Sequence, residues 1–149
     1  MKVVIGIGNP YRNDDGVGPA LAERLAKLVT SDVDVRVLDG EPTALLDAWT
    51  DAQLAIVVDA VLCEPARPGQ IHRTTTAALN RNSATSSHGL GVPEAVELGE
   101  VLGRLPERLI VYAVEAADVG YGTDLSPAVA AALPELLDAV RIDLEHEGG

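Results

Sequence analysis

The stretch VVIGIGNPYRNDDGVG, residues 3–18, decides the fold that we predict for this chain. It begins with a continuous apolar segment of strand length, which is typical of a strand covered on both faces of a parallel sheet. Glycine, asparagine and proline then mark a tight turn, and Asp14 and Asp15 follow where a helix begins. A strand, a tight turn and a helix in this order are the opening unit of an α/β domain.

The rest of the chain repeats this alternation of strands and helices. Further strands are predicted at residues 33–38, 54–61 and 109–114, with an edge strand at residues 70–75. Helices between neighbouring strands favour right-handed crossovers and therefore parallel pairing. We predict one domain over residues 1–149 with an α/β fold in three αβα layers, formed by a mostly parallel, twisted five-stranded sheet with helices on both faces.

Helical periodicity predicts the elements that cover this sheet. Helices are expected over residues 15–29 and 45–49, from Pro93 onward, and after the N-cap pair Ser126-Pro127. In the Pro93 helix, four apolar residues are expected to face the core: Val96, Leu98, Val101 and Leu102. Pro134 is expected to kink or divide the last helix, because proline cannot donate the backbone hydrogen bond of a helix interior.

The charge of the chain limits its partners. Eleven lysines and arginines stand against 23 aspartates and glutamates, which gives a formal net charge of -12. Such a charge repels nucleic-acid backbones and anionic membrane surfaces. No run reaches the roughly 20 apolar residues that a membrane span needs. We therefore expect a soluble cytoplasmic protein that binds neither nucleic acid nor membranes, and no leader peptide at its N-terminus.

One cysteine and three histidines limit the redox and metal chemistry. The single thiol, Cys63, excludes an internal disulfide, and the acidic neighbour Glu64 is expected to raise its pKa, so we predict a structural role. His72 and His146 are expected on the surface. His88 lies in a long polar segment, residues 76–91, which has little periodicity and is typical of a functional loop.

Three acidic positions are expected at one edge of the sheet. Asp15 follows the first strand, Asp39 closes the second, and Asp59 interrupts the apolar run of the third. The carboxyl ends of parallel strands meet at one edge, where α/β proteins bind ligands. Clustered carboxylates repel one another unless a cation compensates them. Together with His88, they offer ligands for zinc, nickel or a similar borderline cation.

Each acid also has an ordinary structural explanation. Asp14 or Asp15 can cap the first helix and interact with its dipole. Asp39 precedes a glycine and can simply be a turn residue. Asp59 is harder to explain this way, since a carboxylate buried without a partner in so apolar a strand costs several kcal/mol.

A dinucleotide-binding turn is the competing explanation of the opening glycines. Gly6 and Gly8 begin such a fingerprint, but Tyr11 occupies the position of its third glycine, and proline and two acids disfavour a pyrophosphate. Asp39, where a ribose-binding acid would stand, is the one feature in its favour. We therefore expect no organic cofactor.

Five short motifs carry a resemblance to a known family. In chain order they are Gly6-Ile7-Gly8-Asn9 with Asp14-Asp15-Gly16-Val17-Gly18, Asp39-Gly40, Val58-Asp59-Ala60, His88-Gly89-Leu90-Gly91, and Gly122 with Leu125-Ser126-Pro127. They extend over nearly the whole chain. With these motifs in this order, the chain resembles the hydrogenase maturation endopeptidases, which process the large subunit of nickel-iron hydrogenases.

The resemblance implies an activity and a set of site residues. The activity is removal of a C-terminal extension from a nickel-loaded large-subunit precursor, and the family's metal-binding residues fall here on Asp15, Asp59 and His88. Asp39 matches a further acid that the family relies on, so all four are candidate catalytic residues. The nickel is expected to come with the substrate. Asp15 departs from the commonest pattern, which has glutamate there, and its shorter side chain would place the metal nearer the backbone or bind it more weakly.

The resemblance also defines the alternatives. A non-enzymatic nickel chaperone would use the same three ligands. A peptidyl-tRNA hydrolase has a similar opening motif, but that family needs a histidine soon after the turn and a basic surface, whereas the first histidine here is His72. A protease of the same family with a substrate other than a hydrogenase is a further possibility. No predicted helix is apolar all round, so we expect a monomer that binds its substrate transiently.

Overall fold

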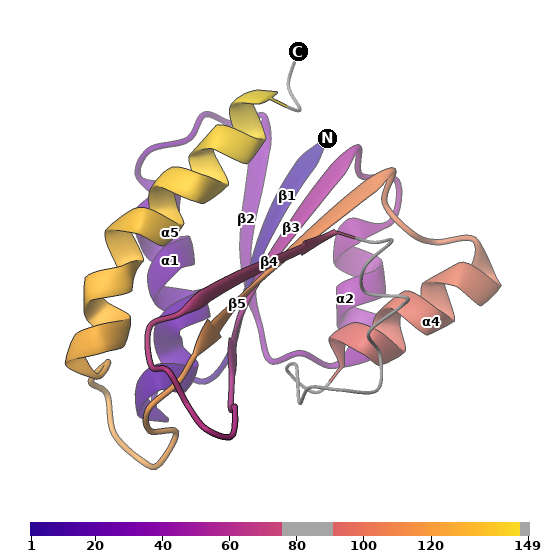
Figure 1. Ribbon diagram of the computed structural model, residues 1–149. Helices are drawn as coiled ribbons and strands as arrows, with labels where there is room; N and C mark the ends of the chain where they lie inside the picture. The colour runs from indigo at the N-terminus through magenta and orange to yellow at the C-terminus, as the bar shows by residue number, and fades with distance from the viewer. Residues whose placement is uncertain (76–90, 147–149) are drawn as a thin grey trace.

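The five strands form one mixed sheet in the computed structural model, which describes residues 1–75 and 91–146 (Figure 1). The sheet order is β2-β1-β3-β5-β4. Three of the four pairings are parallel, and β4 runs antiparallel to β5 at one edge. The strand bounds are β1 Lys2–Ile7, β2 Val33–Leu38, β3 Leu54–Val61, β4 Ile71–Thr75 and β5 Arg108–Glu115.

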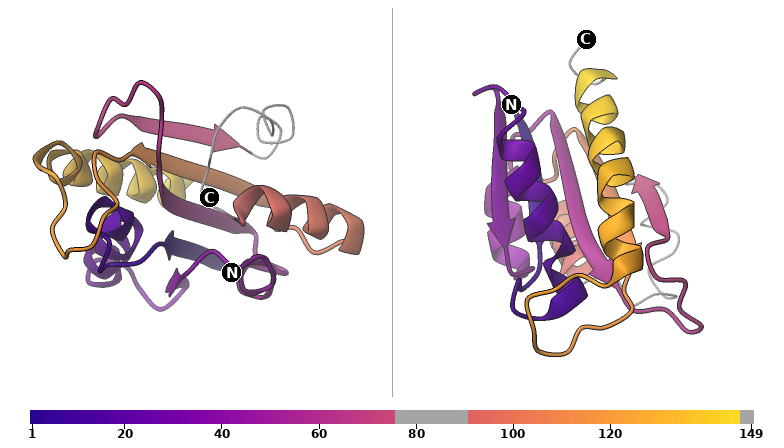
Figure 2. Two further views of the ribbon diagram at one scale, coloured as in Figure 1. Left: turned by 90° about the horizontal axis from the view of Figure 1, so that it is seen from below. Right: turned by 90° about the vertical axis from the view of Figure 1, so that its left-hand side faces the viewer.

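Helices cover both faces of this sheet, as Figure 2 shows from two further sides. Their bounds are α1 Val17–Ala26, α2 Pro42–Trp49, α4 Val92–Leu102 and α5 Pro127–His146, with a short 3-10 turn, η1, at Asn13–Gly16. One apolar cluster lies between the sheet and the pair α1 and α5, and a second between the sheet and the pair α2 and α4. The predicted three-layer α/β fold is confirmed.

The central strand β3 explains why the sheet has helices on both faces. All eight of its residues are buried, because alternate side chains enter opposite clusters: Ile56 and Val58 face α1 and α5, and Ala55 and Val57 face α2 and α4. Such a strand must be covered on both sides. Within the described residues, no helix is long and apolar enough to cross a bilayer.

The inward face predicted for α4 is wrong at two of its four positions. Val101 and Leu102 do not face the core but are 80% and 52% exposed, because the buried face of α4 is formed by Val92, Ala95, Val96 and Gly99, and Val101, two residues after Gly99, lies on the opposite side of the helix. Of the two effects expected of Pro134, a kink or a division of the last helix, the division does not occur, since α5 continues through it over 20 residues. Its ring lies on an exposed face of that helix, away from the sheet.

Candidate functional site

The turn between β1 and α1 depends on a glycine and places Asp15 at the carboxyl edge of the sheet. Gly8 has a φ of 142°, and a Cβ there would lie 1.9 Å from the backbone oxygen of Asp15. Only glycine fits such an approach. Asp15 Oδ2 accepts a hydrogen bond from the backbone N–H of Asn9 at 2.8 Å. The carboxylate is therefore turned back toward the strand end and does not cap α1.

Asp59 is buried near the carboxyl end of β3, with only 4% of its surface exposed. Its Oδ1 accepts a hydrogen bond from the backbone N–H of Ala60 at 2.8 Å, whereas its Oδ2 has no hydrogen-bond partner among the described residues. Burial, and next the negative charge of Asp15, raise the pKa of Asp59 to about 7. Within the part of the chain that the structure describes, Asp59 has the one buried side-chain oxygen or nitrogen without a hydrogen bond. Such an atom is a vacant ligand position for a cation or a proton donor.

Glu115 is a second buried acid at this edge, and the sequence reasoning missed it. It is 1% exposed at the end of β5, opposite Val61 of β3. Its Oε1 accepts from the backbone N–H of Arg67 at 2.7 Å, and its Oε2 lies 2.6 Å from His72 Nε2. The hydrogen bond with His72 lowers the pKa of Glu115. An acid at the end of an apolar run, the signal that selected Asp59, was present here too.

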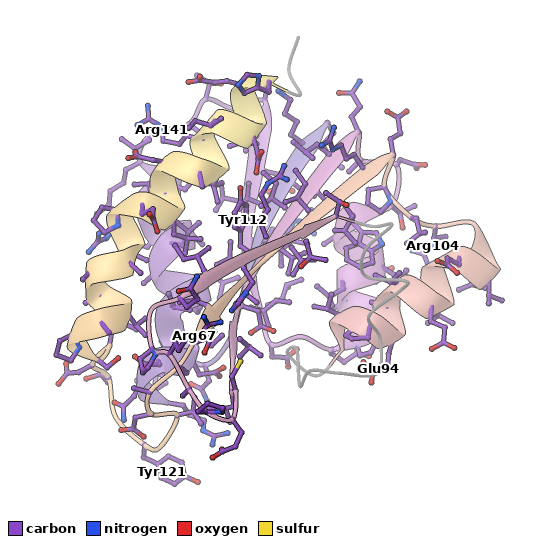
Figure 3. All side chains as sticks on the ribbon, in the orientation of Figure 1. Arg67, Glu94, Arg104, Tyr112, Tyr121 and Arg141 are labelled. Carbon is purple, nitrogen blue, oxygen red and sulfur yellow. The ribbon has the colours of Figure 1, made fainter. Side chains whose placement is uncertain are left out.

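The contacts of Glu115 with its neighbours bear on the predictions made for His72 and Cys63. His72 is half-exposed, as an edge strand allows, but it is engaged by a carboxylate and is not an ordinary surface residue. The pKa of Cys63 is raised, as predicted, by burial and by the charge of Glu115, and Glu64 is not among the causes. Arg67, labelled in Figure 3, places its guanidinium 3.5 Å from Glu115 Oε2. Glu115 is thus fully partnered, in contrast to Asp59.

Asp39 forms a turn at the end of β2. Its Oδ1 accepts from the backbone N–H of Glu41 at 3.0 Å, and the Glu41 side chain in turn accepts from two N–H groups at the start of α2. This agrees with the turn role weighed for Asp39. The exposed carboxyl group also lines a hollow of about 450 Å³ with Gly91 and Glu94, the latter labelled in Figure 3. Asp39 therefore belongs to the same edge as Asp15 without contacting it in any hydrogen bond that the structure describes.

Asp14 joins the turn after β1 to the loop between β5 and α5 and does not cap α1. It is completely buried, and its carboxylate accepts four hydrogen bonds from the loop between β5 and α5. The donors are the backbone N–H groups of Ala117, Asp118 and Ser126 and the Ser126 hydroxyl, at 2.7 to 3.1 Å. The turn that carries Asp15 is therefore fixed to a loop more than 100 residues away in the chain.

His88 lies outside the described residues, as does the rest of the segment 76–90. The described chain resumes at Gly91, whose φ is 116° and where a Cβ would lie 1.7 Å from the backbone oxygen of Gly40. Gly91 thus lies against the residue that follows Asp39. Among residues 1–75 and 91–146, no three or more histidine, cysteine or acidic side chains form a metal-binding group.

Chemically, this edge suits a cation that arrives from outside. Asp59 Oδ2 is unpartnered, and Asp15 lies near enough to raise the pKa of Asp59 by charge repulsion. A divalent cation would neutralise both carboxylates and give the vacant oxygen a partner. The described donors are oxygens, and two carboxylates leave most coordination positions of such an ion open.

Comparison with known proteins relates this chain to one family. The sequence model of a family described as hydrogenase maturation protease matches residues 19–141. The chain is 29% identical to hydrogenase expression/formation protein HupD of Rhodobacter capsulatus, over 93% of this chain and 69% of that protein. It is 25% identical to the hydrogenase 2 maturation protease of Escherichia coli, over 98% of this chain and 92% of that protein.

Solved structures share its fold. The hydrogenase maturating endopeptidase HybD of Escherichia coli superposes with a TM-score of 0.82 at 23% identity, over 99% of this chain and 94% of that one. The [NiFe] hydrogenase maturation protease HybD of Thermococcus kodakarensis superposes with a TM-score of 0.76 at 19% identity, over 95% and 97% of the two chains.

Proposed function

The chain belongs to the hydrogenase maturation protease family, and from this premise we propose that it removes the C-terminal extension of a nickel-loaded hydrogenase large-subunit precursor. It is an endopeptidase, a hydrolase that acts in hydrogenase maturation. The family match favours this activity over a nickel chaperone and over a peptidyl-tRNA hydrolase. The reaction adds water across one peptide bond, so that the carbonyl carbon gains the oxygen and the leaving nitrogen gains a proton.

The observation that carries the proposal is the vacant oxygen of Asp59. In this proposal Asp59 Oδ2 would bind the nickel of the loaded precursor, at a position that no group among the described residues fills. Asp15 would share the ion, which removes the repulsion that now raises the pKa of Asp59. A precursor without nickel would leave two clustered carboxylates uncompensated. The site would therefore favour the loaded form.

His88 and Asp39 complete the proposed set. His88 would supply an imidazole ligand to the same ion, and it precedes Gly91 by three residues, a span of about 10 Å at most. Gly91 is packed against Gly40, beside Asp39. Asp39 would lie along the path of the substrate chain. In this proposal the protein orients the scissile peptide by binding the metal that the substrate brings, and it needs no organic cofactor.

Three accompanying proposals concern the protein's setting. Its partner is the large-subunit precursor, with no nucleic acid or membrane involved, in keeping with the net charge of -12. It acts as a monomer in the cytoplasm, and size-exclusion chromatography with light scattering tests the monomer directly.

The experiment that tests the activity is intact-mass spectrometry of the cognate precursor after incubation with this protein. The expected result is loss of a C-terminal peptide from the nickel-loaded precursor and no loss from the nickel-free one. Cleavage of both forms alike would contradict the proposed role of nickel. Nickel binding without cleavage of either form would contradict the protease activity on this substrate.

A further inference from the structure

Strand β2 forms an open edge of the sheet, since β1 is the strand that neighbours it in the described sheet. The backbone N–H of Gly8 donates to the backbone oxygen of Leu38 at 3.0 Å, so the backbone groups of Leu38 point toward β1. Because these directions alternate along a strand, the backbone groups of Val35 and Val37 point outward. Six residues without proline expose an edge that can pair with another extended chain.

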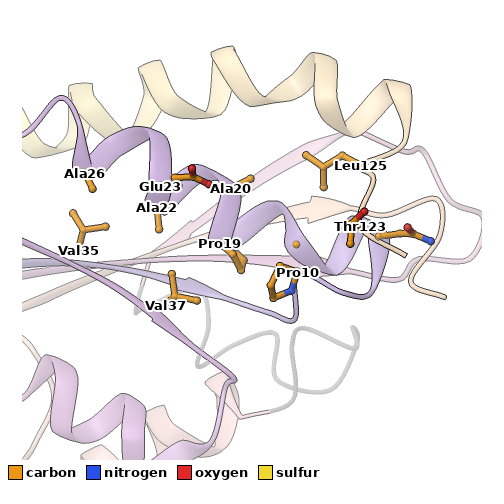
Figure 4. Close-up of a pocket in the computed structure, with 12 residues that line it drawn as sticks. Pro10, Pro19, Ala20, Ala22, Glu23, Ala26, Val35, Val37, Thr123 and Leu125 are labelled. Atoms are coloured by element: carbon orange, nitrogen blue, oxygen red, sulfur yellow. The ribbon is translucent and has the colours of Figure 1, made fainter. Parts of the chain in front are cut away.

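An apolar groove runs beside this edge on the α1 side of the sheet (Figure 4). Its volume is about 570 Å³, and its lining includes Pro10, Pro19, Ala20, Val35, Val37 and Leu125. In Figure 4 the side chains of Val35 and Val37 point toward α1 across the groove, and Val37 is 51% exposed. A strand added to β2 would place alternate side chains in this groove, so apolar residues at every second position would fit it.

The edge leads directly to the candidate site. Strand β2 ends at Leu38, and Asp39 follows, while the groove lining extends to Asn13 and Gly16 on either side of the Asp15 turn. An added strand would lie three strand spacings from β3, or about 14 Å, which an extended chain covers in about four residues. A substrate chain held on β2 can therefore reach Asp59 with a short spacer.

The opposite edge strand, β4, is less suited to such pairing. Its His72 and Arg73 side chains are held by Glu115 of β5 and Asp143 of α5, with Arg73 making bonds of 2.9 and 3.3 Å. On β2, the ion pair between Arg36 and Asp34 is local to the strand and leaves the backbone edge open. Side chains of β4 are therefore bound to neighbouring elements, whereas the charged side chains of β2 bind each other.

We propose that the extension removed by this protease binds as an additional β-strand along β2, with alternate apolar side chains in the groove beside α1 and about four residues between this strand and the scissile bond. This inference rests on the proposed function. A terminal extension is the part of a folded precursor that is free to become extended. Pairing with the backbone recognises shape more than sequence, and the groove adds a preference for apolar residues.

A variant pair at Val37 tests the pairing. Val37→Pro removes the outward N–H, and it leaves the bonds to β1 intact because proline is tolerated on the solvent side of an edge strand. Val37→Thr keeps the N–H and a branched side chain of similar size. Each protein is assayed with the nickel-loaded precursor and with the same precursor shortened to four residues beyond the scissile bond.

For the unaltered protein, shortening the extension should raise KM about tenfold and change kcat little. Val37→Pro should show the raised KM with both precursors, whereas Val37→Thr should retain most of the difference. On binding an uncleaved precursor, the amides of Val35 and Val37 should become protected from hydrogen exchange in the unaltered protein, a readout that requires no variant.

Equal KM values for the two precursors with the unaltered protein, or an undiminished difference in Val37→Pro, would overturn the strand inference while leaving the protease activity in place. Amide protection that appears without precursor as protein concentration rises would also overturn it, by assigning the edge to a second copy of the chain. Failure to cleave either precursor would instead contradict the proposed function on which the inference rests.

Discussion

Two buried acids on neighbouring strands, Glu115 and Asp59, differ in whether their carboxylate oxygens have hydrogen-bond partners among the described residues. Glu115 has all of its charge engaged by Arg67 and His72, and its pKa is lowered. Asp59, near the end of the adjacent strand, has one unpartnered oxygen and a raised pKa. A fully paired carboxylate stabilises the fold, whereas an unpaired one destabilises it and marks a candidate binding atom.

The pKa of Asp59 predicts how stability depends on pH. It rises from 3.8 to about 7 on folding, so between these values the folded state holds a proton that the unfolded state has lost. Stability therefore falls as the pH rises through this window, by up to about 4 kcal/mol. In Asp59→Asn this loss disappears. Urea unfolding at pH 4 and pH 8 should show the variant gaining stability relative to the unaltered protein as the pH rises.

Glu115→Gln is the matched control for that measurement. The lowered pKa of Glu115 means that its stabilising contribution is present at neutral pH and is lost as the pH falls through the folded value. The variant should therefore be the less stable protein at pH 8, with a deficit that shrinks on acidification. If both variants showed the same pH trend, the contrast between the two acids would be wrong.

At the residue scale, sequence reasoning could identify Asp59 but not the role of Asp14. An acid inside an apolar run is visible in the sequence. The four donors that surround Asp14 come from residues 117, 118 and 126, which only the folded chain brings near it. Local sequence therefore suggested helix capping, and the long-range contacts determine the actual role.

At the scale of the element, helix α4 is bounded by two glycines that serve different purposes. Gly103, at its end, has a φ of 67° and open space where a Cβ would be. Gly91, before its start, has a φ of 116° and is also closely packed, since a Cβ there would lie 1.7 Å from the backbone oxygen of Gly40. Gly103 is needed only for its positive φ, whereas Gly91 is needed both for its positive φ and for its close packing against the turn that follows Asp39.

This difference predicts unequal effects of alanine at the two positions. Gly103→Ala should lower the free energy of unfolding by about 1 kcal/mol, the cost of a left-handed alanine. Gly91→Ala should lower it by about 3 kcal/mol or more, because the backbone of α4 or of the Asp39 turn must move. It should also reduce cleavage of the precursor. Thermal unfolding and the cleavage assay check both, and equal effects at the two ends would contradict the account.

The strands were predictable because their signal is local. The predicted bounds of β2 and β3 agree with the structure, since β3 is a continuous apolar run covered on both faces and β2 is a half-exposed strand that alternates apolar and charged residues and ends at a turn. The inward face of α4 was predictable only in part. Val101 and Leu102 are left out of the second core cluster, although Leu105 and Leu109 beyond them contribute to it, and which face of a helix is covered is a property of the assembled layers.

At the scale of the whole molecule, the sheet gathers the candidate chemistry at one edge. Asp15, Asp39 and Asp59 come from three successive strand ends, as predicted from topology. Because side chains alternate along a strand, Asp59 lies on the same face of β3 as Ala55 and Val57, the face that α2 and α4 cover. The groove beside β2 lies on the other face, next to α1. The open edge of β2 borders both faces and lies beside the groove.

We propose that the vacant oxygen of Asp59 receives the nickel of the substrate. Isothermal calorimetry of the nickel-loaded and nickel-free precursors, with Asp59→Asn and with the exposed helix control Asp138→Asn, measures whether Asp59 contributes to this recognition of nickel. The unaltered protein and the control should bind the nickel-loaded precursor at least about tenfold more tightly, and Asp59→Asn should bind both forms alike. A nickel-dependent gain that survives undiminished in Asp59→Asn would contradict the claim.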